Sequence, residues 1–180
     1  MADGDWRADV LKFWFGLPEE KRWRGGDELD EDIRRRFLKL WSEKRALPAG
    51  SFLTDPLTAL AGVVLFDQFP RNIFRGHADQ FSTDPLALEI SKGALDRGLD
   101  SQLEPQERGF LYMPLEHSER LEDQNRSLLL FSELGDAKML RYAQLHRDII
   151  ARFGRFPHRN AMLGRPPRAD ETAAGEVFPW

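Results

Sequence analysis

Apolar side chains recur along this chain at the spacing of a helix with one buried face. No stretch alternates apolar and polar residues convincingly, as a half-buried strand would. The longest example, segment 27–45, has an apolar face made of Ile33, Phe37, Leu40 and Trp41. This spacing and its Gly and Pro breaks predict helices over 9–15, 27–45, 55–69, 84–97, 104–111, 119–134, 136–153 and 169–178. Loops are predicted over 23–26 and 154–168.

Segment 55–69 is the candidate central helix, because its middle is apolar on nearly every side. Asp55 can cap its first turn, where the missing N–H of Pro56 costs nothing. Gly62 indicates a close crossing with another helix. Pro70 is expected to force the preceding residue out of helical angles and to end the element there.

Segments 119–134 and 136–153 are separated by Gly135 alone, which predicts an antiparallel helical hairpin with Ser118 as the cap of its first helix. The four residues Thr-Asp-Pro-Leu occur at 54–57 and again at 83–86, which we interpret mainly as repeated capping chemistry. The predicted fold class is therefore all-α, a stack of antiparallel helix pairs forming an α-α superhelix, with residues 1–180 as a single helical domain.

Composition excludes several classes of protein. The chain has 180 residues, a net charge of −4 and no cysteine, so it offers no disulfide, no thiolate metal site and no cysteine nucleophile. The charge gives no argument for nucleic acid or membrane partners. The N-terminus is acidic and lacks the features of a secretory signal, and the longest apolar run, 57–66, is about half of a membrane span. We expect a cytoplasmic protein.

Polar side chains interrupt the apolar stripes of the predicted hairpin. The stripe of its first helix consists of Leu121, Leu128, Phe131 and Leu134. Gln124 falls on this stripe, and His117 lies one turn before it. His146 sits in the apolar stripe of the second helix. Burying such groups without partners costs a few kcal/mol each, so they are either core side chains paired with a carbonyl or carboxylate, or parts of a site.

Two similar turns follow strongly apolar helices. The first contains Asp67, Gln68, Phe69, Pro70, Arg71, Asn72 and Arg75, and the second contains Phe156, Pro157, His158, Arg159, Asn160 and Arg165. In the structural interpretation, Arg71 and Arg159 brace helix C-termini, and the asparagines are turn residues. In the functional interpretation, the two turns converge and present guanidinium groups to one anion.

The charges of the C-terminal third are compatible with both the structural and the functional interpretation of the arginines. Segment 141–168 contains seven arginines, no lysine and a single acid, Asp148, which favours bidentate contacts with carboxylate or phosphate. Acids that could pair with these arginines lie elsewhere in the chain, namely Asp67, Asp84, Glu116 and Glu119. A buried arginine–carboxylate network would use the same residues and leave no ligand site.

Other chemistries find little support. Segment 116–119, Glu-His-Ser-Glu, offers three kinds of metal ligand, but its spacing matches no zinc signature. No strand-to-helix nucleophile elbow, glycine-rich phosphate loop or dinucleotide fingerprint is present. We therefore predict no metal site and no cofactor.

Four blocks carry a resemblance to a known family. They are 10–16 (Val-Leu-Lys-Phe-Trp-Phe-Gly), 66–76, 110–119 and 146–165, the last of which includes Arg-Phe-Gly-Arg-Phe-Pro-His-Arg-Asn. Through them the chain resembles the bacterial family catalogued as domain of unknown function 924. The resemblance implies an all-helical, tetratricopeptide-like fold and no particular activity. It also implies a Ser-Thr pair after Arg165 as the cap of the last helix, where this chain has Pro166, Pro167 and Arg168.

Two functions remain open. The first is a helical-repeat module that binds a peptide or protein partner in a groove lined by arginine and histidine. The alternative is an enzyme or small-molecule binder for an anionic carboxylate or phosphate ligand, with His117 and His146 as catalytic acid/base candidates. The candidate ligand-binding residues are Asp67, Gln68, Arg71, Asn72, Arg75, Tyr112, Glu116, Glu119, Gln124, Arg152, Arg155, His158, Arg159 and Asn160.

Overall fold

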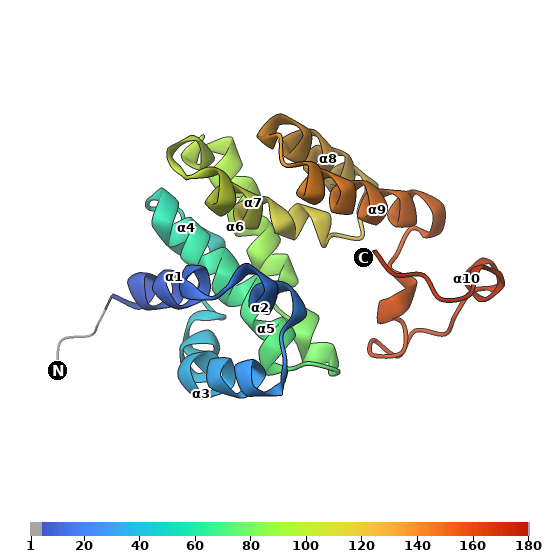
Figure 1. The fold of residues 1–180 in the computed structure, drawn as a ribbon, viewed down its shortest axis with the longest axis horizontal. Coiled ribbons are helices and arrows are strands. Elements are labelled where there is room, and N and C mark those ends of the chain that lie inside the picture. Colours follow the sequence, from blue (N-terminus) through green and yellow to red (C-terminus); the bar gives the residue numbers. More distant parts are fainter. Residues whose placement is uncertain (1–4, 180) are drawn as a thin grey trace. The chain divides into compact units, whose positions relative to one another are not determined.

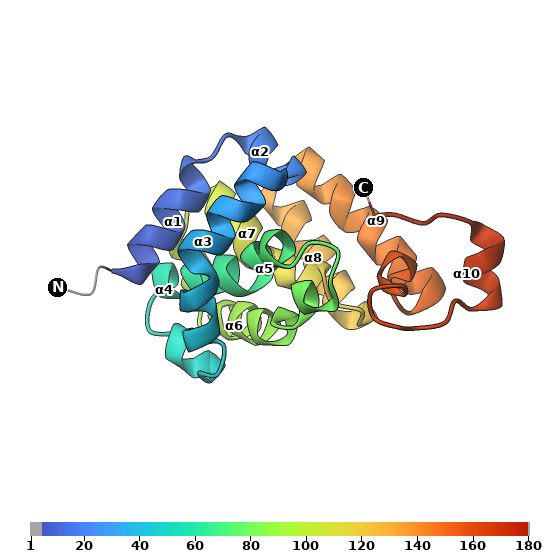
Figure 2. The ribbon, with the colours of Figure 1, turned by 90° about the horizontal axis from the view of Figure 1, so that it is seen from below.

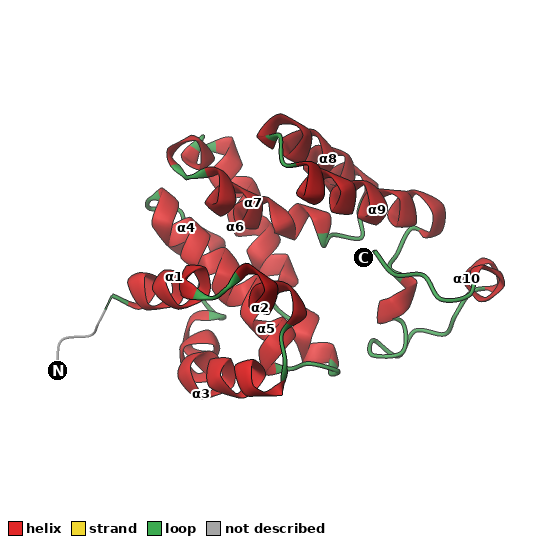
Figure 3. Cartoon of the chain, viewed as in Figure 1, coloured by secondary structure: helices red, strands yellow, loops and turns green. Residues whose placement is uncertain are grey.

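A computed structural model describes residues 5–179, and every regular element in that range is helical (Figure 3). The α-helices are α1 (Trp6–Gly16), α2 (Glu19–Arg24), α3 (Asp27–Lys44), α4 (Pro56–Val63), α5 (Phe69–Ile73), α6 (Asp84–Asp96), α7 (Pro105–Glu116), α8 (Leu121–Leu134), α9 (Ala137–Phe153) and α10 (Ala169–Ala174). The all-helical class is confirmed, and the tetratricopeptide-like superhelix stays a prediction. No helix in the described range is long and apolar enough to cross a membrane.

The chain divides into two compact units, Met1–Leu111 and Tyr112–Trp180, and we describe each by itself. In the first unit α4 is central: α1 and α6 pack against it, and α3 packs against α5 (Figures 1 and 2). The side chains from Ala59 to Phe66 are buried, as the all-round apolar pattern predicts. A Cβ on Gly62 would lie 3.2 Å from Phe52 and 3.3 Å from Ile90 of α6, which confirms the close crossing.

The two Thr-Asp-Pro-Leu repeats have different roles. Asp55 caps α4 as predicted, because its carboxylate accepts the backbone N–H of Thr58 at 2.9 Å. In the second copy Thr83 occupies the N-cap position, and Asp84 lies inside α6. The Asp84 carboxylate accepts hydrogen bonds from Arg71 instead. The capping interpretation therefore holds only for the first copy.

The prediction that Pro70 ends the central helix is wrong. A π-helical turn over Val64–Gln68 follows α4, and α5 then continues through Pro70, with Phe69 at helical angles (φ −59°, ψ −38°). In a regular α-helix the Phe66 carbonyl would bond to the N–H of residue 70, which proline lacks. The Thr83 hydroxyl donates to this carbonyl at 2.7 Å and accepts the Trp41 indole N–H at 3.1 Å. A tertiary contact thus replaces the helical bond.

Other boundaries also differ from the pattern. Helix α7 runs through Pro114 instead of ending before it. The predicted loop over 23–26 begins inside α2, whose Trp23 ring stacks on Phe110 with 5.8 Å between ring centroids. The turn comes two residues later, where Gly25 adopts a positive φ of 66°. Aromatic packing and helix continuity therefore override the local breakers.

The hairpin of α8 and α9 in the second unit is confirmed (Figure 1). Gly135 adopts a left-handed conformation, and Asp136 caps α9 by accepting the N–H groups of Lys138 and Met139, both at 3.0 Å. Helix α8 begins two residues later than predicted, at Leu121, whose side chain is 43% exposed and does not belong to the buried stripe. The Ser118 hydroxyl precedes the helix and accepts the Arg120 N–H at 3.2 Å.

Replacing Thr83 by valine tests the contact that accommodates Pro70. The substitution leaves the Phe66 carbonyl and the Trp41 indole without this partner, at about 1–3 kcal/mol for each buried group. We expect Thr83→Val to lower the free energy of unfolding measured in urea by that order. Thr83→Ser keeps the hydroxyl and is the control. A loss in Thr83→Val no larger than the loss in Thr83→Ser would contradict the prediction, because it would mean that the hydroxyl contributes no more than the methyl group that serine lacks.

Candidate functional site

Arg71 of the first predicted turn is held by carboxylates. Its guanidinium donates to both oxygens of Asp84 at 2.8 and 3.0 Å, and also to the Asp67 backbone carbonyl. Burial alone would lower the pKa of Arg71, but the charges of Asp84 and Asp67 raise it above its usual value. Asp67 is fully buried and accepts the Gln68 amide at 2.6 Å. Arg71 therefore braces a helix turn, as the structural interpretation holds.

Arg75 and Asn72 converge on Asp30, a residue that sequence reasoning missed. Asp30 accepts from Arg75 at 2.5 and 2.9 Å and from the Asn72 amide at 2.7 Å. These contacts leave no room at Gly25, where a Cβ would collide with the Arg75 guanidinium. The signal was present in the sequence, because Asp30 lies one turn before Ile33 on the buried face of α3.

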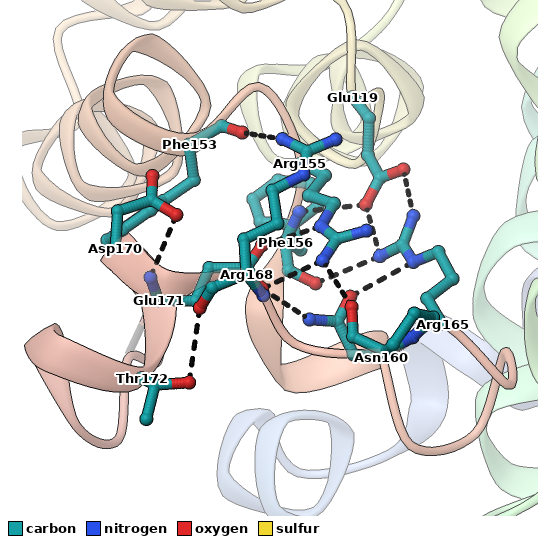
Figure 4. Close-up of polar contacts among 11 residues, drawn as sticks. Glu119, Phe153, Arg155, Phe156, Asn160, Arg165, Arg168, Asp170, Glu171 and Thr172 are labelled. Carbon is teal, nitrogen blue, oxygen red and sulfur yellow. Dashed lines mark hydrogen bonds and ion pairs between the residues drawn. The ribbon is translucent and has the colours of Figure 1, made fainter.

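In the second unit, Glu171 joins three parts of the C-terminal segment (Figure 4). Its carboxylate accepts from the Arg155 guanidinium at 2.5 and 2.8 Å, from the Asn160 amide at 2.9 Å and from the backbone N–H of Arg168 at 2.8 Å. The bonds from Arg155 above all lower the pKa of Glu171 to about 2. The Arg168 contact satisfies a free N–H at the start of α10, which compensates for the missing Ser-Thr pair.

Glu119 makes a second junction in the same network (Figure 4). It accepts from the Arg165 guanidinium at 2.7 and 2.9 Å and from the backbone N–H of Phe156 at 2.8 Å. Burial would raise the pKa of Glu119, but the bonds from Arg165 and Phe156 lower it. Arginine–carboxylate pairs of the kind that the sequence offered as an alternative are thus present at Arg71, Arg155 and Arg165, which are largely buried, and at Arg75, which is half exposed.

His146 is paired with Glu116. Its Nδ1 lies 2.9 Å from Glu116 Oε1 and 2.8 Å from the Tyr142 carbonyl oxygen. A carboxylate and a carbonyl are both acceptors, so we assign the hydrogen to Nδ1, which makes Nε2 the lone-pair nitrogen of the neutral ring. Among residues 5–179, the structure gives Nε2 no hydrogen-bond partner. Glu116 and the Tyr142 carbonyl thus fix the orientation of the His146 ring.

Two further histidines lie near this pair, and together we call His117, His146 and His158 the histidine cluster. The rings of His117 and His146 have centroids 6.0 Å apart. The Phe156 ring lies 5.6 Å from both His146 and His158. Side chains from the residue after α7, from α9 and from the second Phe-Pro turn therefore meet within one unit.

Arg159 adds a permanent positive charge to the histidine cluster. Its guanidinium carbon lies 4.6 Å from the centroid of the Phe156 ring, and its NH2 group donates to the His117 carbonyl at 3.1 Å. Burial, and then the positive charges of Arg159 and His146, lower the pKa of His158 to about 4. His158 is therefore neutral at pH 7, where its ring can both donate and accept a hydrogen bond.

Gln124 positions the turn that carries His117. Its amide nitrogen donates to the carbonyls of Glu116 and Ser118 at 2.6 and 2.7 Å, and its side chain is fully buried. The prediction that Gln124 lies on the inward face of the helix is confirmed. Of the remaining candidates, Tyr112 is buried against Phe131, and the Arg152 guanidinium lies over the Phe153 ring.

A shallow groove of about 880 Å³ lies in the first unit, outside the predicted sites. It is lined by Glu31, Arg34, Arg35, Leu38, Lys39, Trp41, Ser42, Glu43, Arg45, Phe74 and Asp79. None of these residues was a candidate site residue in the sequence analysis.

In the range 5–179, no three His, Asp or Glu side chains are grouped so that they could hold a metal ion. The convergence of the two Phe-Pro turns on one anion stays a prediction, because they belong to different units.

Comparisons with known proteins show which proteins this chain is similar to, and the descriptions of those proteins state no activity. A family model described as "Bacterial protein of unknown function (DUF924)" matches residues 10–174. The solved structure of the protein of unknown function ATU0120 from Agrobacterium tumefaciens is similar, with a TM-score of 0.87 and 36% sequence identity over 96% of this chain and 97% of that one. A search of curated proteins found no match.

The low pKa of His158 predicts a dependence of stability on pH. An unfolded histidine takes up a proton near pH 6.5 and the folded His158 near pH 4, so the free energy of unfolding should fall as the pH drops from 6.5 to 4. Solvent reaches part of the ring, so we expect a slope below the limit of about 1.4 kcal/mol per pH unit for one proton. Urea denaturation at several pH values measures it.

The matched variants are His158→Gln, which should flatten this slope, and His77→Gln, which should leave it unchanged because His77 is exposed and lies in the first unit. A slope that survives in His158→Gln would mean that another group takes up the proton.

Proposed function

This chain belongs to the bacterial family of unknown function DUF924, and since that membership brings no activity with it, we propose a function from its side chains: the second unit binds a small anion at the histidine cluster and exchanges a proton with it. The observation that carries the proposal is the Glu116–His146 pair. The ligand class is a carboxylate or a phosphate, and the chain acts as a small-molecule binder or enzyme on it.

The charges around the histidine cluster favour an anion. Arg159 is positive at any physiological pH, and its guanidinium lies beside His117, to whose backbone carbonyl it donates. The nearest acids are already engaged, Glu116 with His146 and Glu119 with Arg165. An incoming carboxylate or phosphate would therefore have the Arg159 guanidinium as its cationic partner, above the apolar ring of Phe156.

The orientation of the imidazoles supports proton transfer. Glu116 holds the proton of His146 on Nδ1, so Nε2 can accept a proton from a bound ligand, and the carboxylate would stabilise the resulting imidazolium. His117 supplies a second imidazole ring, 6.0 Å away between centroids. A base and an acid next to one cationic anchor form the minimum set for acid–base chemistry on an anionic substrate.

A peptide-binding groove has less support. That function needs arginines that face a partner, whereas Arg71, Arg75 and Arg155 each bind a carboxylate of their own unit. A guanidinium in such a bidentate pair would have to exchange one partner for another on binding, with little net gain. The small-anion function needs only Arg159 and the imidazoles.

Thermal shift and calorimetry with inorganic phosphate and with acetate test the proposal. A ligand at a hundred times its Kd stabilises the folded state by about 2.7 kcal/mol, which raises the melting temperature by several degrees. We expect this shift with the unaltered chain, and its loss in His146→Gln and Arg159→Gln. His77→Gln, an exposed histidine of the first unit, should keep it.

Circular dichroism of the ligand-free variants separates binding from folding. If His146→Gln and Arg159→Gln retain the helical signal and lose the shift, the side chains act on the ligand. If neither anion stabilises the unaltered chain at concentrations up to about 0.15 M, the physiological ionic strength at which exposed charges are already largely screened, the proposal is wrong.

A further inference from the structure

Two buried polar atoms near the histidine cluster have no hydrogen-bond partner among residues 5–179. They are Gln124 Oε1 and Ser127 Oγ, and both side chains are fully buried. The amide nitrogen of Gln124 is satisfied by two carbonyls, so only its acceptor oxygen is left over. A buried polar group without a partner costs about 1–3 kcal/mol, which makes two of them on one helix a feature that requires an explanation.

The two side chains lie on one face of α8. Gln124 and Ser127 are three residues apart, which places them one turn from each other on the same side of the helix. Gln124 is also linked to the histidine cluster, because its amide nitrogen donates to the carbonyl of Glu116, whose carboxylate pairs with His146.

A hydroxyl group fits the hydrogen-bonding chemistry of both atoms. The Gln124 oxygen only accepts, so its partner must donate a hydrogen, whereas the Ser127 hydroxyl can donate and accept. A ligand hydroxyl can donate to Gln124 and accept from Ser127 at the same time. An ammonium or a guanidinium would satisfy the Gln124 oxygen, but either would add a positive charge beside the imidazoles.

We infer that the second unit selects an anion that carries a hydroxyl group, a hydroxycarboxylate or a hydroxylated organic phosphate, with the hydroxyl bound between Gln124 and Ser127. This inference rests on the proposed function, since the same ligand places its charged group at Arg159 and the histidine cluster. Ser127 then determines specificity. Gln124 links the two ends of the site, because its nitrogen also holds the Glu116 carbonyl.

The test compares matched anions that differ by one hydroxyl or by a pair of hydroxyls. Lactate is measured against propionate, and glycerol 3-phosphate against propyl phosphate, by isothermal titration calorimetry with the full chain. A site built to bond a hydroxyl discriminates strongly against an analogue that lacks it, so we expect the hydroxylated anion to bind at least about tenfold more tightly in one of the pairs. The pair that shows the preference identifies the charged group.

Ser127→Ala should abolish the preference for the hydroxylated anion. The affinity for the analogue without the hydroxyl should stay within about twofold of that of the unaltered chain, because the substitution removes only the serine hydroxyl. Ser132→Ala, an exposed serine of the same helix, is the control and should keep the preference. If Ser127→Ala does not fold, the comparison of anions on the unaltered chain decides alone. Equal affinities within both pairs overturn the inference and leave the proposed function standing, whereas failure of all four anions to bind overturns both.

Discussion

The carboxylate of Glu119 holds together three segments on which the candidate site depends. It lies between α7 and α8, and it accepts hydrogen bonds from the Arg165 guanidinium and from the backbone N–H of Phe156. Phe156 in turn lies against His146 and His158 and beneath Arg159. Without that anchor, a turn that contains only a short 3-10 segment over Pro157–Arg159 would have little to hold it against the hairpin.

The charged and titratable side chains of this unit differ in how fully their hydrogen-bonding groups are paired. Bidentate pairs such as Arg155–Glu171 are closed, since each guanidinium already has a complementary carboxylate. His146 differs, because Glu116 engages only one of its ring nitrogens. Buried polar networks of the closed kind specify one arrangement of the chain, and a partly satisfied group beside them is where ligand chemistry becomes possible. The proposed site therefore rests on a rigid frame of ion pairs.

The helices, the caps at Asp55 and Asp136, the close approach at Gly62 and the α8–α9 hairpin were all predictable from the sequence, because each leaves a local signal: a capping side chain, a glycine in an apolar run or a one-residue break between two helices. The polar residues Gln124 and His146 were found because they interrupt apolar stripes. The prediction that Pro70 ends the helix was wrong because the Phe66 carbonyl, which cannot bond to proline, accepts a hydrogen bond from Thr83 instead. The local sequence pattern does not reveal that partner. Asp30 was missed although it obeys the same stripe rule.

By itself, the sequence determined the all-helical class and the burial of polar side chains such as Gln124 and His146, since both follow from periodicity along the chain and from the cost of removing polar groups from water. Only the tertiary structure decided which partner each of these side chains has. Arginine can bind any carboxylate within reach, and the distance between them depends on packing between segments far apart in the chain. Packing therefore determined that Arg71 is paired with Asp84, whereas only Nδ1 of the His146 ring is paired, with Glu116.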